Sequence, residues 1–264
     1  MRRAVATSAN FHSIALRMSP VAIHWQVLDP DAPRLAPERS RAPQFHLWRQ
    51  ALDLDENARR RLQRRVPVAT ALAGQRAVAD QWLRLILASY LRRDPGELRF
   101  ARQPKGRPHC IDAPQGFDFN LSHSGTRLLI AIAAQQVGAD LESTRRSRSI
   151  DALAGEVLHA DEQDWLERQT AACRVETFMR LWVAKEALLK AHGMGVWDGI
   201  RQLRLGQLES ALWTIAAAPA SVGNCASWRA FEFAPDVGYR AAIAFEQGAD
   251  PARLSFYQLT PDQL

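Results

Sequence analysis

Residues 117–142 read FDFNLSHSGTRLLIAIAAQQVGADLE and determine the expected fold. The segment opens with a strand-like run, turns at His123-Ser124-Gly125, and continues into an apolar run from Leu128 to Ile132. A glycine-containing turn between two such runs predicts a strand, a turn and a buried strand. VGADLE (137–142) predicts the strand that follows. The stretch therefore predicts three consecutive strands.

Helical periodicity appears on both sides of this stretch. Residues 72–93 place apolar side chains at helical spacing, and Asp94-Pro95-Gly96 predicts where that helix ends. Residues 176–192 (ETFMRLWVAKEALLKAH) predict a second helix that stops before Gly193. Residues 161–168 predict a shorter one with Asp161 as its N-cap.

Further strands are expected near both ends of the chain. VAIHWQVL (21–28) alternates in hydropathy, and GYRAAIAF (238–245) and LSFYQL (254–259) are strand-like. Residues 29–47 contain four prolines and predict a loop. The mixture of strands and helices along the whole length predicts an α/β fold.

Composition excludes several protein classes. The chain has 264 residues, 47% hydrophobic and 23% charged, which excludes disordered and collagen-like chains. Three cysteines are too few for a disulfide framework or a zinc site. No apolar run approaches the roughly 20 residues needed to cross a bilayer. We therefore expect a cytoplasmic protein without a membrane-spanning segment.

Lysine is scarce among the 34 basic residues, occurring only as Lys105, Lys185 and Lys190. Genome composition explains a general arginine excess. A lysine ammonium is nevertheless a compact point charge, whereas a guanidinium is a planar fork, so each retained lysine marks a position to inspect. The basic surplus lies within residues 1–110, which indicates a polyanionic partner.

Two segments carry candidate metal and phosphate chemistry. Asp140 and Glu142 are two residues apart on a predicted strand and share a face, and paired carboxylates suit a hard cation such as Mg²⁺. The alternative is solvated acids at a strand end. On the 176–192 helix, Glu186 and Lys190 lie one turn apart among apolar neighbours, which favours a cleft over an exposed ion pair. Lys185 points about 100° away from Glu186, and its role stays open.

Two further segments are candidate anion sites. Ser122 and His123 are adjacent on a strand, so they point oppositely and do not form a nucleophile–base pair, but they could bind an anion. Gly106 lies between Lys105 and Arg107 and allows the backbone to approach a ligand closely. In each case a solvated polar turn is the alternative.

The order of these segments resembles one enzyme family. KGRP (105–108), FNLSHS (119–124), GADLE (138–142) and WVAKEALLK (182–190) follow one another. This succession is similar to that of the 4′-phosphopantetheinyl transferases of the large monomeric class. The resemblance covers about residues 105–195. It implies a pseudo-dimer of two similar α/β halves with the active site between them. We place the halves at residues 18–137 and 138–264 and expect an N-terminal extension at residues 1–17.

The resemblance also implies roles for individual residues. Asp140, Glu142 and Glu186 would hold Mg²⁺, with Mn²⁺ as the alternative, and the implied catalytic residues are Glu186, Lys190 and Asp140. The implied coenzyme A ligands are Lys190 at the phosphates, Ser122 and His123 at the nucleotide end, Lys105 or Arg107 at the adenine pocket, and Arg60 and Arg76 as further phosphate ligands. Glu162 resembles a family glutamate that assists catalysis.

The implied reaction moves 4′-phosphopantetheine from coenzyme A to a serine of an acyl or peptidyl carrier protein and releases adenosine 3′,5′-bisphosphate. The carriers would serve fatty-acid, polyketide or peptide synthesis, and the enzyme would be a cytoplasmic monomer that needs no nucleic acid. One alternative is a nucleic-acid-binding protein that uses NARRRLQRR (57–65). Another is a homologue that binds coenzyme A or a carrier without catalysis, against which the intact acidic residues argue.

Overall fold

The structure is a computed structural model that describes residues 26–27, 45–67, 73–145, 150–195, 197–246 and 254–259. The expected extension at residues 1–17 lies outside these ranges, as does most of the strand expected at 21–28. No helix in the described ranges combines the length and apolarity that a bilayer crossing requires.

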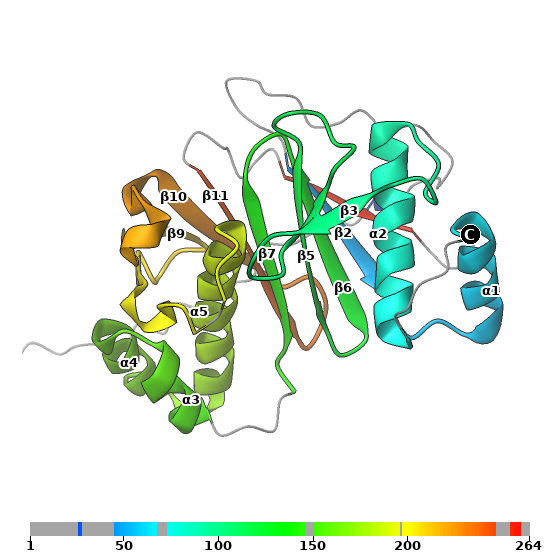
Figure 1. Ribbon diagram of the computed structural model, residues 1–264. Helices are drawn as coiled ribbons and strands as arrows, with labels where there is room; N and C mark the ends of the chain where they lie inside the picture. The colour runs from blue at the N-terminus through cyan, green and yellow to red at the C-terminus, as the bar shows by residue number, and fades with distance from the viewer. Residues whose placement is uncertain are drawn as a thin grey trace, which may run out of the picture.

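Two five-stranded sheets form the centre of the molecule (Figure 1). The first has the order β1 (Gln26–Val27), β12 (Leu254–Gln258), β2 (Phe45–Ala51), β6 (Arg127–Ala133) and β5 (Asp118–Ser124). The second has the order β7 (Val137–Ser143), β11 (Tyr239–Glu246), β10 (Trp228–Phe233), β9 (Leu212–Ala217) and β8 (Arg204–Gly206). A small pair, β3 (Phe100–Arg102) and β4 (Pro108–Cys110), forms a separate two-stranded sheet.

Helices cover the outer faces of the two sheets. The helices are α1 (Glu56–Arg65), α2 (Gln75–Leu91), α3 (Ile150–Val157), α4 (Ala160–Glu167) and α5 (Ala171–Ala191), and short 3₁₀ turns span Ile200–Gln202, Ala220–Val222 and Cys225–Ser227. One core joins the first sheet to α1 and α2, another joins the second sheet to α3, α4 and α5, and a third lies between the sheets. Side chains of β6 alternate between two of these cores. Ile130 packs toward α2, whereas Leu129 and Ala131 pack toward the second sheet.

The three central strands and the two long helices expected from the sequence are confirmed, and two local expectations are wrong. The stretch at 117–142 forms β5, β6 and β7, and the two long helices are α2 and α5. The predicted loop is wrong at its end, because β2 begins at Phe45. Asp161 is not the N-cap of α4: that helix starts at Ala160, and the His159 ring accepts the amide of Asp161 while Glu162 bonds back to the amide of His159.

The two sheets do not coincide fully with the two predicted halves of the chain, residues 18–137 and 138–264. The boundary at 137/138 falls at the first residue of β7. The last strand, β12, returns to the first sheet and pairs in parallel with β2, with Phe256 opposite Leu47. The first sheet therefore contains a strand from the segment expected to form the C-terminal half.

A buried ion pair fixes α5 against α4. Both side chains of Lys185 and Glu162 are fully buried, with Nζ 2.5 Å from Oε2. The ammonium also donates to the carbonyl oxygens of Val157 and Ile200, and Glu162 accepts the amide of Leu205 at 2.8 Å. Burial lowers the pKa of Lys185, and Glu162 opposes that shift. The lysine is therefore a structural cross-link between three segments.

A close approach fixes the other side of α5. A Cβ atom at Gly138 of β7 would lie 1.8 Å from the Ala187 carbonyl oxygen and 2.6 Å from the Ala191 nitrogen, both in the backbone of α5. Only glycine allows this contact between helix and strand.

We predict that Gly138→Ala lowers the free energy of unfolding by about 3 kcal/mol or more, because the methyl group must displace a backbone. Gly155→Ala in α3 is the matched control, since its Cβ meets no atom of the described residues within 4 Å and its helical backbone gains up to about 1 kcal/mol. Urea unfolding measures both variants, and equal stability of the two would contradict the close approach.

We predict that Lys185→Met lowers the free energy of unfolding by about 3–5 kcal/mol, because Glu162 is then left as an uncompensated buried charge. Lys105→Met serves as the control: Lys105 is an exposed lysine with one ion pair, to Asp198, and such pairs contribute about 0–1 kcal/mol. If thermal and urea unfolding gave the same loss for both lysines, the structural role of Lys185 would be refuted.

Candidate active site

β5 lies beside β7, the edge strand of the second sheet (Figure 1). Polar side chains of β5 face β7. Alternate side chains of β5 accept hydrogen bonds from backbone amides of β7 in place of a neighbouring strand. These bonds are Val137 N–H to Asp118 (2.9 Å), Ala139 N–H to Asn120 (3.0 Å) and Ser143 N–H to Ser124 (3.1 Å). They satisfy backbone groups that would otherwise be orphaned at a sheet edge.

Three carboxylates gather beside this contact. Asp140 and Glu142 extend from β7 toward α5, which supplies Glu186. One oxygen from each of the three lies within 4.8 Å of the other two, and all three residues are buried. Such a cluster needs compensating positive charge.

Lys190 of α5 supplies part of that charge. Its Nζ lies 2.5 Å from Oδ1 of Asp140 and 3.7 Å from Oε2 of Glu186. It also donates to Ser122 Oγ at 2.9 Å, and Ser122 donates to Asp140 Oδ1 at 2.8 Å. Burial alone would lower the pKa of Lys190, but Asp140 and then Glu186 raise it above its usual value. The carboxylates therefore favour the charged form of the lysine.

The carboxylates fit a divalent metal ion. Three oxygen donors are the hard ligands that Mg²⁺ prefers. Asp140 also has a buried oxygen, Oδ2, which no hydrogen-bond donor in the described ranges reaches. A buried carboxylate oxygen without a partner is costly in an apolar interior and is the atom that a cation would satisfy.

Three of the residues expected to bind the nucleotide, Ser122, His123 and Lys105, differ in their surroundings. Ser122 lies inside the cluster, and His123 is close enough to Lys190 and Arg76 for both cations to act on it. Partial desolvation lowers the pKa of His123, and Lys190 and Arg76 lower it further. Lys105 is exposed and pairs with Asp198 at 2.9 Å.

Arg107 and Arg60 are engaged elsewhere. The Arg107 guanidinium donates to Asp118 and to the carbonyl oxygens of Val137 and Ala191, so it ties β5 to β7 and α5. Arg60 pairs with Glu56 on the exposed face of α1, because Ala58 and Leu62 turn the opposite face of that helix into the core. The structure does not bring Arg60 to the carboxylates.

Glu162, for which the resemblance implies a part in catalysis, is fully buried in its pair with Lys185. Its second oxygen accepts the amide of Leu205. Both carboxylate oxygens are therefore occupied by structural contacts, and we assign Glu162 to the packing of α4 and α5.

Sequence reasoning missed three residues at the site: Asp118, Asn120 and Ser124. The signal that identifies them is the alternation in DFNLSHS, in which every second residue from Asp118 is polar. On a strand these residues share one face. A polar face on a strand that is otherwise buried indicates that the face contacts polar partners within the protein.

Comparison with known proteins identifies one family to which the chain is similar. The model of the 4′-phosphopantetheinyl transferase superfamily matches residues 136–244. The 4′-phosphopantetheinyl transferase HetI of a Nostoc species is 32% identical over 219 residues, covering 76% of this chain and 87% of that protein.

Two relatives from Bacillus match shorter parts. Psf-1 of Bacillus pumilus is 30% identical over 172 residues (59% of this chain, 71% of that protein), and Sfp of Bacillus subtilis is 29% identical over 119 residues (45% and 52%). Both carry the name 4′-phosphopantetheinyl transferase. With the Nostoc relative matched over most of its length, this chain belongs to the 4′-phosphopantetheinyl transferase superfamily.

Proposed function

We propose that this protein transfers 4′-phosphopantetheine from coenzyme A to a serine of an acyl or peptidyl carrier protein. The observation that carries the proposal is the buried cluster of Asp140, Glu142 and Glu186 with Lys190 beside it, in a chain of this family. In the reaction the serine oxygen forms a bond to the phosphorus that bears the pantetheine arm. The bond from that phosphorus to the bridging oxygen breaks, and adenosine 3′,5′-bisphosphate leaves.

Asp140, Glu142 and Glu186 would hold Mg²⁺, or Mn²⁺ in its place. The ion, when bound, neutralises the pyrophosphate and the charge that develops on the leaving group. Glu186 is the carboxylate that we propose to take the proton of the carrier serine. It comes from α5, whose position is fixed by Gly138 on one side and Lys185 on the other.

Lys190 stabilises negative charge at the transferred phosphoryl group. Its Nζ lies 2.5 Å from Asp140 Oδ1, and its flexible stem allows the ammonium to follow a moving charge. Ser122 orients Lys190 and Asp140 through one hydroxyl group.

The basic residues of the first half would bind the nucleotide end of coenzyme A. We propose that His123 and Arg76 contact its phosphates and that Lys105 lies near the base. Of the two candidates in the KGRP turn, the exposed ammonium of Lys105 is the more accessible, since Arg107 is engaged by four protein oxygens. Arg107 then shapes the pocket by holding the turn.

We further propose a cytoplasmic monomer that does not act on nucleic acid. Cys110, Cys173 and Cys225 are free thiols, as expected in a reducing compartment. The carrier pathway is fatty-acid, polyketide or peptide synthesis. Because carrier proteins are generally acidic, the arginine-rich surface would speed their docking.

The test is the mass of an apo carrier protein after incubation with this enzyme, coenzyme A and Mg²⁺. We expect a gain equal to one phosphopantetheine group, no gain with EDTA, and no gain when the carrier serine is replaced by alanine. A panel of fatty-acid, polyketide and peptide carriers identifies the substrate. If no carrier gains mass, while DNA or RNA binds tightly with a steep salt dependence, the protein is instead a nucleic-acid-binding member of the family.

We predict that Glu186→Gln lowers kcat by at least about 100-fold, because the amide neither accepts the serine proton nor carries the charge of a metal ligand. Glu156→Gln, in α3, is the matched control and should retain full activity. Equal rates for the two variants in the carrier assay would exclude Glu186 as metal ligand and base.

A further inference from the structure

We propose that Ser124 is a positioning residue that orients the Glu142 carboxylate for metal binding. The inference rests on the proposed metal-dependent function and adds a role that the four sequence motifs do not assign. Ser124 ends β5, in the first sheet, whereas Glu142 belongs to β7, in the second. The serine therefore controls a metal ligand from the opposite half of the molecule.

The hydroxyl of Ser124 accepts one hydrogen bond and donates another, and the Glu142 carboxylate is the acceptor of the second. Oγ accepts the backbone amide of Ser143 at 3.1 Å and lies 2.7 Å from Glu142 Oε2. A hydroxyl that accepts from an amide has its proton free for the carboxylate, which when ionised can only accept. The side chain is buried, so water does not compete for either bond.

This contact restricts the rotation of the carboxylate. A glutamate side chain has a broad final torsion, so a free carboxylate samples many orientations. A short bond to one oxygen selects an orientation before a metal ion binds and lowers the ordering cost of binding. Partners of this kind typically change metal affinity by about 10- to 100-fold.

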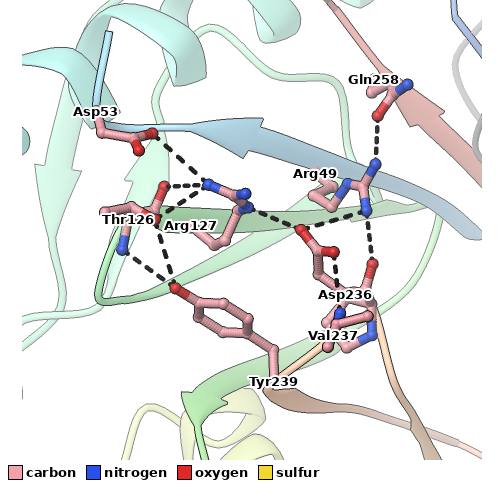
Figure 2. Close-up of polar contacts among 9 residues, drawn as sticks. Arg49, Asp53, Thr126, Arg127, Asp236, Val237, Tyr239 and Gln258 are labelled. Atoms are coloured by element: carbon pink, nitrogen blue, oxygen red, sulfur yellow. Dashed lines mark hydrogen bonds and ion pairs between the residues drawn. The ribbon is translucent and has the colours of Figure 1, made fainter. Parts of the chain in front are cut away.

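The second half of the molecule holds Ser124 in place through the β5–β6 turn (Figure 2). Gly125 follows the serine with φ of +54°, and a Cβ there would lie 2.9 Å from Tyr239 Oη. The Tyr239 hydroxyl accepts the Thr126 amide at 3.3 Å. The turn is thus fixed against β11, the strand that pairs with β7.

Arginines strengthen the same connection. Arg127, next in the chain, donates to Asp236 at 2.9 Å, and Arg49 of β2 donates to the Pro235 carbonyl oxygen at 2.8 Å. Figure 2 shows both guanidinium groups converging on the loop between β10 and β11. The turn that carries Ser124 therefore cannot move away from β7 without breaking these contacts.

The test measures Mn²⁺ binding by electron paramagnetic resonance of the free ion, so it does not depend on activity. We expect Ser124→Ala to weaken Mn²⁺ binding by about 10-fold and Ser124→Thr, which keeps the hydroxyl, to restore most of it. Ser124→Cys, close in volume but a weak donor, should resemble alanine and serves if the alanine variant unfolds. Ser89→Ala is the matched control, since it removes a hydroxyl bonded to the Ile86 carbonyl oxygen in α2 and should leave binding unchanged.

A double-mutant cycle separates positioning from general destabilisation. If Ser124 acts through Glu142, adding Ser124→Ala to Glu142→Gln should weaken Mn²⁺ binding no further. Additive losses would overturn the inference. Wild-type affinity in both Ser124→Ala and Ser124→Cys would also overturn it while leaving the transferase function standing. A wild-type protein that binds no Mn²⁺ would overturn both the inference and the proposed metal dependence.

Discussion

The candidate active site depends on the contact between the polar face of β5 and the edge of β7. Side-chain oxygens of Asp118, Asn120 and Ser124 replace a missing neighbouring strand for β7. A buried edge strand without such partners would leave amides unsatisfied at a cost of about 1–3 kcal/mol each. The same alignment places Ser122 beside Asp140. One strand face therefore both joins the sheets and orders the acidic cluster.

Helix α5 completes the site because two unrelated constraints fix its position. Gly138 lets the helix backbone approach β7 closely, and the buried Lys185–Glu162 pair holds the opposite side. Between them, Glu186 and Lys190 meet the carboxylates of β7. Two of the three lysines thus have distinct roles: Lys185 stabilises the scaffold, and Lys190 supplies charge at the site. An arginine would replace neither without change, because both ammonium groups occupy compact sites among several oxygens.

The sequence predicts the members of the acidic cluster and its lysine better than the residues that arrange them. The pairing of Asp140 with Glu142 and of Glu186 with Lys190 follows from strand and helix periodicity. The role of Lys185 depends on Glu162, which is distant in sequence. β2 was missed because prolines precede it, and its pairing with β6 and β12 overrides that local signal. Likewise, no local pattern in the sequence indicates that β12 pairs with β2 in the first sheet.

The most direct test of the β5–β7 contact is amide hydrogen exchange at Ala139, resolved by NMR. Ala139 lies in the edge strand, and Asn120 is the side chain that accepts its amide. We expect slow exchange of this amide in the wild type and much faster exchange in Asn120→Ala, while the alternate amides of β7, which point to β11, stay protected. Equal protection of Ala139 in the two proteins would contradict the claim that β5 side chains hold the edge of β7.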